Sequence, residues 1–71
     1  MSEADKMLEK TGYEKYKYLE HTDYYNRDTD KIISFRNDKS IAVFNSYDEI
    51  VSITMQELKI IIKKCEEKGW I

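Results

Sequence analysis

Hydrophobic positions recur at helical spacing near both ends of the chain and with a period of two between them. A first helix is predicted over residues 3–11, opened by Ser2 and Asp5 in the loose form of a capping box. Its apolar face comprises Ala4, Met7, Leu8 and Thr11. Gly12 follows where a left-handed C-terminal cap is needed, and Tyr13 is placed to fold back on Leu8.

Alternation with a period of two predicts a strand from Tyr13 to Thr22. Tyr16 and Tyr18 would lie on one face of this strand, and Lys15, Lys17 and Leu19 on the other. Residues 23–30, with the sequence DYYNRDTD, are rich in turn formers and are predicted to be an exposed connection.

Two further strands are predicted after this connection. One carries Ile32, Ile33 and Phe35, and the other runs over residues 41–44. A hairpin with Asn37 or Asp38 in the left-handed conformation would join them. Residues 50–53 form either a short fourth strand or an extended lead-in to the last helix.

The last helix has the clearest start signal, because Thr54 and Glu57 form a capping box and Ile53 is placed to pack on Leu58. Its predicted core face comprises Met55, Leu58, Ile61, Ile62 and Cys65, while Lys59, Lys63, Lys64, Glu66 and Glu67 would face solvent. Ile60 lies off this stripe and either borders the sheet or is exposed at a contact surface. Gly69 would cap the helix, with Trp70 touching Cys65.

These elements predict one α+β domain spanning residues 1–71. Its order is an N-terminal helix, a three- or four-stranded antiparallel meander and a C-terminal helix, with both helices packed on one face of the sheet. The other face of the sheet would be open to solvent or to a partner.

Composition narrows the class of protein further. The chain has 71 residues, 41% of them hydrophobic, which is too much apolar material for a disordered chain even though 37% are charged. The net charge of −2 provides no global field for binding nucleic acid or an anionic membrane. A single cysteine excludes an intramolecular disulfide, and no signal peptide or membrane-spanning run is evident, so a cytoplasmic location is expected.

No catalytic or cofactor motif is present. His21 is the single histidine and is interpreted as an ordinary surface residue, and Cys65 is interpreted as a small buried hydrophobic residue. Asp23, Asp28 and Asp30 lack the spacing and the glycine of a calcium-binding loop. We therefore expect no enzymatic activity, no cofactor and no metal.

The most unusual feature is a cluster of tyrosines interleaved with cations. Candidate partner-binding residues in it are Tyr16, Tyr18, Tyr24, Tyr25 and Arg27, with Lys15 and Lys17 nearby. Tyrosine and arginine are enriched at protein interfaces, and aromatics beside cations also bind single-stranded nucleic acid. The structural alternative to both is that Tyr16 and Tyr18 face the helices as part of the core, and that Tyr24 and Tyr25 only hold the loop in place. Since Tyr24 and Tyr25 are adjacent, they should point to opposite sides of an extended chain, with at least one exposed.

The segments SEADKMLEKTGYEKY and ITMQELKIIIKKCEEKGWI, about half the chain, resemble small uncharacterised proteins encoded by bacteriophages and prophages of Gram-positive bacteria. The resemblance implies an accessory protein that acts in the host cytoplasm by binding, and it assigns no role to any residue. We expect a non-enzymatic protein that binds a host or phage macromolecule, with a protein as the favoured partner. A single-stranded nucleic-acid-binding module is the alternative, and a homodimer remains open.

Overall fold

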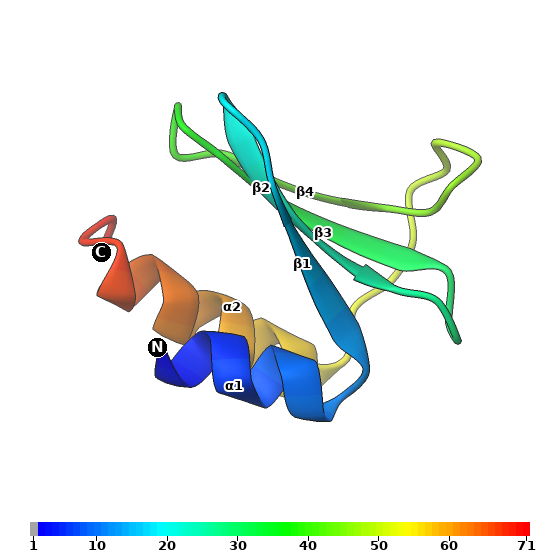
Figure 1. The fold of residues 1–71 in the computed structure, drawn as a ribbon, viewed down its shortest axis with the longest axis horizontal. Helices are drawn as coiled ribbons and strands as arrows, with labels where there is room; N and C mark the ends of the chain where they lie inside the picture. The colour runs from blue at the N-terminus through cyan, green and yellow to red at the C-terminus, as the bar shows by residue number, and fades with distance from the viewer. Residues whose placement is uncertain (1) are drawn as a thin grey trace.

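A computed structural model describes residues 2–71 as two helices and a four-stranded sheet (Figure 1). The elements in chain order are α1 Glu3–Lys10, β1 Tyr13–Lys17, β2 His21–Asn26, β3 Lys31–Arg36, β4 Ile41–Phe44 and α2 Met55–Glu67. The strands pair antiparallel in the order β1-β2-β3-β4, and α2 packs against α1. The predicted architecture of a helix, an antiparallel meander and a second helix is confirmed.

The first helix begins and ends close to the predicted residues. Ser2 Oγ accepts a hydrogen bond of 2.9 Å from the Asp5 amide, which confirms the N-cap. The helix ends at Lys10, with Thr11 as its C-cap, one residue earlier than predicted. Gly12 has a φ of +98°, the left-handed conformation that a C-terminal cap favours.

The predicted single strand over residues 13–22 was wrong, because the chain reverses direction within it. The Tyr18 amide donates to the His21 carbonyl at 2.9 Å and closes a tight turn at Leu19 and Glu20. The predicted connection over residues 23–30 was also wrong in its first half, since Asp23–Asn26 belong to β2. Only the four residues after β2 form a turn, in which Asn26 Oδ1 accepts from the Asp28 and Thr29 amides.

The later strands agree with the pattern in position but not in every turn. In the hairpin between β3 and β4, the left-handed residue is Lys39, with a φ of +70°, rather than Asn37 or Asp38. Asp38 instead accepts hydrogen bonds from the amide and hydroxyl of Ser40. Residues 50–53 are an extended lead-in to α2, with a single β-bridge between Ile50 and Phe44. The strand that completes the four-stranded sheet is therefore β2, of which residues 23–26 had been predicted to be a loop.

The caps of α2 are as predicted, but its buried face is rotated. Thr54 Oγ1 and Glu57 form the complete capping box. At the other end, the Trp70 amide donates to the Cys65 carbonyl at 2.9 Å, as in a Schellman motif. Buried positions are Ile60, Ile61, Lys64 and Cys65, whereas Met55 and Ile62 are exposed. The expected exposure of Lys64 and burial of Met55 and Ile62 were wrong, because the sheet contacts a face centred nearer Ile60.

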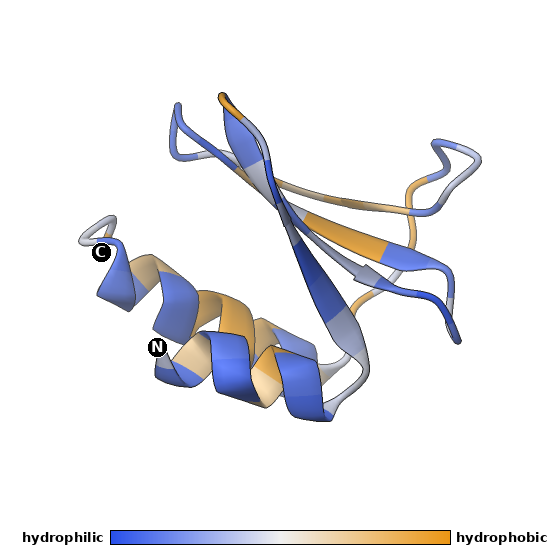
Figure 2. Ribbon diagram, in the orientation of Figure 1, coloured by the Kyte–Doolittle hydropathy of each residue, from blue (hydrophilic) through white to orange (hydrophobic). Residues whose placement is uncertain are grey.

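Both helices lie on one side of the sheet and enclose the core (Figure 1). The core joins Leu8 from α1 and Ile60 from α2 to Tyr24, Ile33 and Phe35 from the sheet. Hydrophobic residues alternate with hydrophilic ones along both helices and lie in β3 and β4, whereas β1 and β2 are mostly hydrophilic (Figure 2). None of the helices within residues 2–71 is long and apolar enough to cross a membrane.

Two partly buried carboxylates, Asp5 and Glu57, bind the helices to the sheet. Asp5 Oδ1 on α1 accepts from the Tyr24 hydroxyl at 2.5 Å and from Lys64 Nζ on α2 at 2.9 Å, while Lys15 Nζ contacts Asp5 Oδ2 at 3.0 Å. Burial alone would raise the pKa of Asp5, but these hydrogen bonds outweigh it and hold the pKa well below its usual range. The charge of Lys64, which is 8% exposed, is thereby neutralised in the core.

Glu57 repeats this arrangement at the start of α2. Its Oε2 accepts from the Tyr13 hydroxyl at 2.6 Å, and its Oε1 accepts from Lys31 Nζ at 2.8 Å and from the Thr54 amide at 2.8 Å. Burial opposes ionisation here too, yet these hydrogen bonds lower the pKa of Glu57. Glu57 of the capping box therefore also connects α2 to β1 and β3.

Candidate functional site

Within residues 2–71, no helix or strand covers the face of the sheet opposite the helices, which is called here the outer face. Since Tyr13, Tyr24 and Ile33 point into the core, their neighbours in each strand point outward. The outward side chains are Glu14 and Tyr16 in β1, His21, Asp23 and Tyr25 in β2, Ile32, Ser34 and Arg36 in β3, and Ala42 and Phe44 in β4.

The strand register arranges these side chains in rows across the sheet. One row runs from Tyr16 through Asp23 and Ser34 to Ala42. Apart from Tyr16, the side chains of this row are short. The next row contains larger side chains, with Tyr25 opposite Ile32 and Ile32 opposite Phe44. A row of short side chains beside a row of long ones leaves a depression in the surface.

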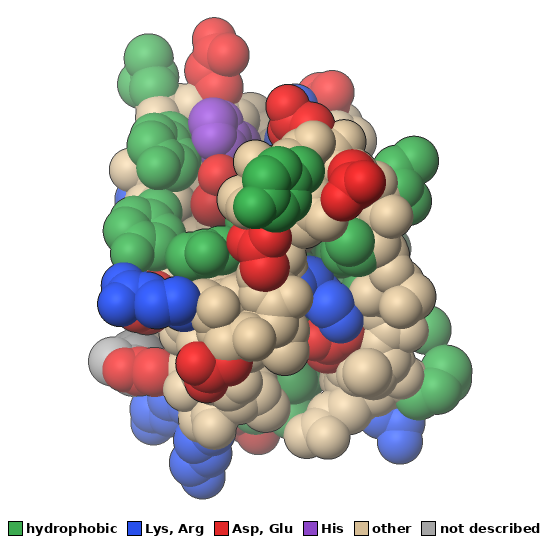
Figure 3. Space-filling view, turned by 90° about the vertical axis from the view of Figure 1, so that its right-hand side faces the viewer, with side chains coloured by type: hydrophobic (Ala, Val, Ile, Leu, Met, Phe, Trp, Pro, Cys, Tyr) green, Lys and Arg blue, Asp and Glu red, His purple; other side chains and the backbone are tan. Residues whose placement is uncertain are grey.

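This depression, called here the outer hollow, has a volume of about 270 Å³ and is lined by Tyr16, Tyr18, Asp23, Tyr25, Ile32 and Ser46. Hydrophobic side chains gather beside the histidine, with acidic groups among them (Figure 3). Tyr16 and Tyr18 expose 40% and 53% of their surface, so the hollow opens to solvent between aromatic rings.

Two polar atoms beneath the outer face lack hydrogen-bond partners within residues 2–71. They are Asp23 Oδ1 and Ser34 Oγ, which belong to residues paired directly across β2 and β3. Ser34 is only 1% exposed. Asp23 Oδ2 has His21 Nε2 at 3.6 Å, which leaves Oδ1 without a donor. Buried polar atoms are nearly always paired in folded proteins, so two neighbouring exceptions mark this place as unusual.

The tyrosine rings around the outer hollow are held by contacts with their neighbours. Tyr18 stacks on His21 with ring centroids 4.7 Å apart. The Tyr16 hydroxyl donates to Glu14 at 3.0 Å, which raises the pKa of Tyr16. The Tyr25 hydroxyl donates to Asp30 at 3.4 Å. The rings are therefore oriented before any partner arrives, which reduces the conformational entropy lost on binding.

A larger hollow of about 710 Å³ lies on the helix side of β1, and its lining includes Asp5, Lys15, Tyr24 and Lys64. The polar groups of these residues are bonded to one another in the Asp5 network described above. No unpaired acceptor of this network faces the hollow, so its chemistry is used by the fold. The smaller outer hollow is the better candidate site.

The structure brings three of the predicted partner-binding residues together. Tyr16, Tyr18 and Tyr25 line one hollow. Arg27 lies in the turn after β2, is 75% exposed at its side chain and pairs with Glu14 at 3.6 Å. Tyr24 was wrongly placed among the surface candidates, because it points into the core and is 1% exposed. Tyr24 and Tyr25 are not both buried, as predicted from their adjacency, but Tyr25 is half-buried rather than exposed.

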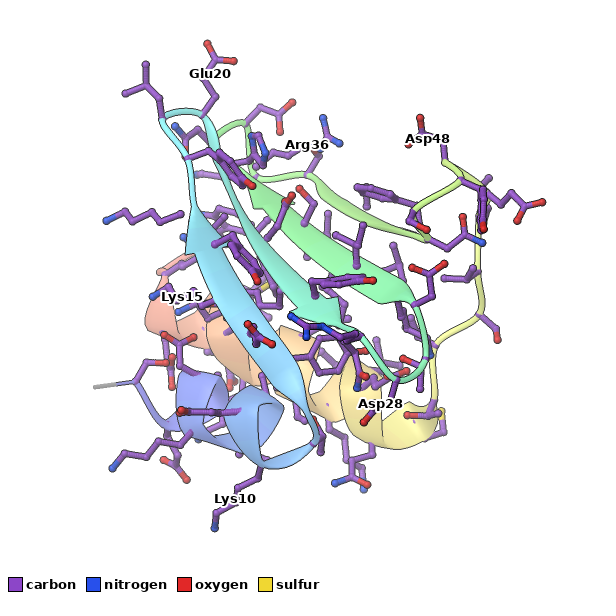
Figure 4. All side chains as sticks on the ribbon, turned by 45° about the vertical axis from the view of Figure 1, so that its right-hand side comes forward. Lys10, Lys15, Glu20, Asp28, Arg36 and Asp48 are labelled. Atoms are coloured by element: carbon purple, nitrogen blue, oxygen red, sulfur yellow. The ribbon has the colours of Figure 1, made fainter. Side chains whose placement is uncertain are left out.

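The lysines that were grouped with the tyrosines lie on the other face. Lys15 and Lys17 alternate with Tyr16 along β1 and share the side of the buried Tyr13. Lys15 is bonded to Asp5, and Figure 4 shows it projecting from the β1 edge toward the helices. The sheet thus separates these cations from the tyrosine rings.

Reasoning from the sequence missed Asp23, Ser34 and His21 as parts of this site. Asp23 was assigned to an exposed loop, and His21 was interpreted as an isolated surface residue. The signal available was the alternation of His21, Asp23 and Tyr25 with Thr22, Tyr24 and Asn26, which matches a strand. This alternation is a weak signal because one of the inward residues, Asn26, is polar. Asn26 is nevertheless 5% exposed, since its side chain is hydrogen-bonded to Thr11 and to the turn after β2.

Comparison with protein-family models, with curated proteins and with solved structures gave no match. Among residues 2–71, no group of three or more His, Cys, Asp or Glu side chains is arranged to hold a metal ion. Cys65 is buried, as predicted, and burial raises the pKa of its thiol. The outer hollow is therefore interpreted from its own geometry.

Proposed function

We propose that this protein is a non-enzymatic, phage-type accessory protein that binds another protein through the outer face of its sheet. The observation that carries the proposal is the convergence of Tyr16, Tyr18 and Tyr25 on one hollow above the unpartnered Asp23 Oδ1. Tyrosine provides a large contact area for few frozen torsions, and interface hot spots are enriched in it.

The unpaired acceptors support binding rather than a passive surface. An acceptor that is buried without a hydrogen bond costs about 1–3 kcal/mol relative to a satisfied one. The free energy of unfolding of a small domain is low. A destabilising unpaired acceptor is therefore expected mainly where the acceptor also binds a partner. A partner that donates to Asp23 Oδ1, in the lining of the hollow, would recover this free energy on association.

The nucleic-acid alternative is less well supported by the same geometry. Stacking of bases on tyrosines requires cations on the same face to pair the phosphates. Lys15 and Lys17 are on the opposite face, Arg27 is paired with Glu14, and Asp23 would repel a phosphate at the centre of the hollow. We expect no mobility shift of a labelled single-stranded oligonucleotide at low salt with micromolar protein. A shift that weakens when Arg27 is replaced by Ala would favour the alternative.

Site-specific photo-cross-linking tests the proposal with a matched pair of positions. A benzophenone amino acid replaces either Tyr16 or Lys17, which are adjacent and exposed but point to opposite faces. Each variant is irradiated in a lysate of a Gram-positive host, and adducts are identified by mass spectrometry. We expect a discrete protein adduct from position 16 and none of the same mass from position 17.

Equal adducts from both positions, or none from position 16 when the variants are folded, would contradict the proposal. An adduct with twice the mass of the chain would identify a second copy as the partner. An adduct with nucleic acid would replace the proposal with the alternative.

A further inference from the structure

The outer hollow has the features of a site for a cationic side chain, and we infer that it receives an arginine side chain of the partner protein. The inference rests on the proposed function and specifies the chemistry that the partner must present. It follows from three properties of the hollow: its charge, its aromatic walls and its size.

The charge at the floor of the hollow is negative and incompletely paired. Asp23 lines the hollow, and its Oδ1 is shielded from water without a donor. His21 Nε2 lies 3.6 Å from the other oxygen. Two more carboxylates lie at the rim, since Glu14 binds the Tyr16 hydroxyl and Asp30 binds the Tyr25 hydroxyl. A buried carboxylate is best satisfied by a charged donor.

The walls of the hollow favour the same kind of ligand. Cations bind over the electron-rich faces of tyrosine rings, and sites for organic cations combine several such rings. Tyr16, Tyr18 and Tyr25 provide them here. Within residues 2–71, the cations that lie over aromatic rings are Lys64 over Tyr24 and Lys68 over Trp70. Neither of these contacts involves a tyrosine of the hollow.

Size and hydrogen bonding select arginine among the cationic groups. A volume of about 270 Å³ is at the lower limit for a drug-sized ligand but suits one long side chain. Guanidinium is planar, stacks on aromatic rings and presents a fork of donors, whereas ammonium is a compact, strongly hydrated charge. The carboxylate of Asp23, whose Oδ1 lacks a donor, lies in the lining of the hollow and suits a planar fork of donors better than a point charge.

The test uses the blocked amino acid N-acetyl-arginine methylamide as a probe on the full chain. Backbone amide shifts of the labelled protein are followed by NMR while the probe is added at constant ionic strength. We expect saturable shifts centred on Tyr16, Asp23 and Ser34, with a Kd in the millimolar range. The lysine and leucine counterparts should bind at least about threefold more weakly, because they lack the planar fork.

Matched variants locate the binding. Asp23→Asn should weaken binding of the arginine probe about tenfold or more, while Asp28→Asn removes the same charge from the exposed turn and should leave the Kd unchanged. Tyr18→Leu keeps an apolar side chain but removes the aromatic face, and a several-fold loss is expected. The Tyr18 variant decides the test if Asp23→Asn disturbs the fold.

Shifts that do not saturate, that are equal for the leucine probe, or that persist in Asp23→Asn and Tyr18→Leu would overturn the inference. Its failure is distinguishable from failure of the proposed function. A protein cross-linked at position 16 without arginine binding would retain the function and reject the arginine. Saturable arginine binding with no face-specific cross-link would retain the site and reject a protein partner.

Discussion

The Tyr24 hydroxyl donates a hydrogen bond of 2.5 Å to Asp5 Oδ1 and thereby joins the second strand to the first helix. Lys64 of α2 donates to the same oxygen, so a single atom connects three elements. Glu57 of α2 is bonded to Tyr13 of β1 in the same manner. The sheet of this small domain is thus attached to its helices by tyrosine–carboxylate pairs as well as by apolar packing.

Replacing Tyr24 by Phe should destabilise the fold by about 1.5–3 kcal/mol, the typical contribution of a hydrogen bond to a charged group. The ring remains in the core, so the loss reports the hydroxyl contact with Asp5. Chemical denaturation measures the change in the free energy of unfolding. Tyr47→Phe, at a residue that is 80% exposed, is the control and should have little effect. Equal stabilities of the two variants would contradict the role assigned to the Tyr24–Asp5 bond.

Acid should unfold the protein through the same carboxylates. Hydrogen bonds outweigh burial and lower the folded-state pKa of Asp5 and Glu57, so their contribution is present above the ordinary carboxyl pKa of about 4. It is lost as the pH falls toward the folded-state values. We therefore expect the free energy of unfolding to decline below about pH 4.

Asp5→Asn tests the assignment, because this variant should be less stable at neutral pH yet lose less stability on acidification. The two curves should converge at low pH. Glu9→Gln, which removes an exposed charge from the same helix, is the matched control. A wild-type slope in Asp5→Asn would show that other groups dominate the acid transition.

Local signals in the sequence were sufficient for most of the fold. Caps at Ser2, Thr54, Gly12 and Gly69 depend on backbone geometry within a few residues, and all of them are observed. The turn between β1 and β2 was missed because Leu19 and Glu20 are not turn formers. It is stabilised by strand pairing, which a local pattern does not reveal.

The orientation of α2 and the composition of the site depend on contacts between distant residues. Lys64 is buried because Asp5, fifty-nine positions away, neutralises it, and no periodicity of charges shows this pairing. Similarly, the outer hollow arises from the register that places Tyr16 opposite Asp23 and Asp23 opposite Ser34. The tyrosine cluster was visible in the sequence. Its separation from Lys15 and Lys17 was not, because it depends on which face of β1 packs on the helices.

The two capping glycines provide a matched prediction. Both have positive φ, +98° at Gly12 and +74° at Gly69, so alanine at either position costs about 1–2 kcal/mol. An added Cβ at Gly12 would also lie 3.2 Å from Asn26 Nδ2, whereas nothing lies within 4 Å at Gly69. Thermal denaturation should therefore show a larger loss for Gly12→Ala than for Gly69→Ala. The reverse order would indicate that Asn26 moves aside without cost.

Substitutions of Ser34 and of its neighbour Ile33 test whether an unpaired hydroxyl beneath the outer face lowers the stability of the fold. Both are almost fully buried, but Ile33 points into the core whereas Ser34 lies beneath the outer face with an unpartnered Oγ. Ile33→Ala should cost about 2–5 kcal/mol, since it leaves a cavity. Ser34→Ala removes an unsatisfied polar atom and should leave stability unchanged or raise it by up to about 1 kcal/mol.

The same Ser34→Ala variant should bind the arginine probe as tightly as the wild type, because Ser34 Oγ is buried and does not line the outer hollow. Asp23→Asn should instead weaken the binding of the probe, because Asp23 lines the hollow. Denaturation and the NMR titration measure the two effects on the same sample. If Ser34→Ala lowers stability as much as Ile33→Ala does, the hydroxyl has a structural role. Weaker binding of the probe by Ser34→Ala than by the wild type would contradict the exclusion of Ser34 from the hollow.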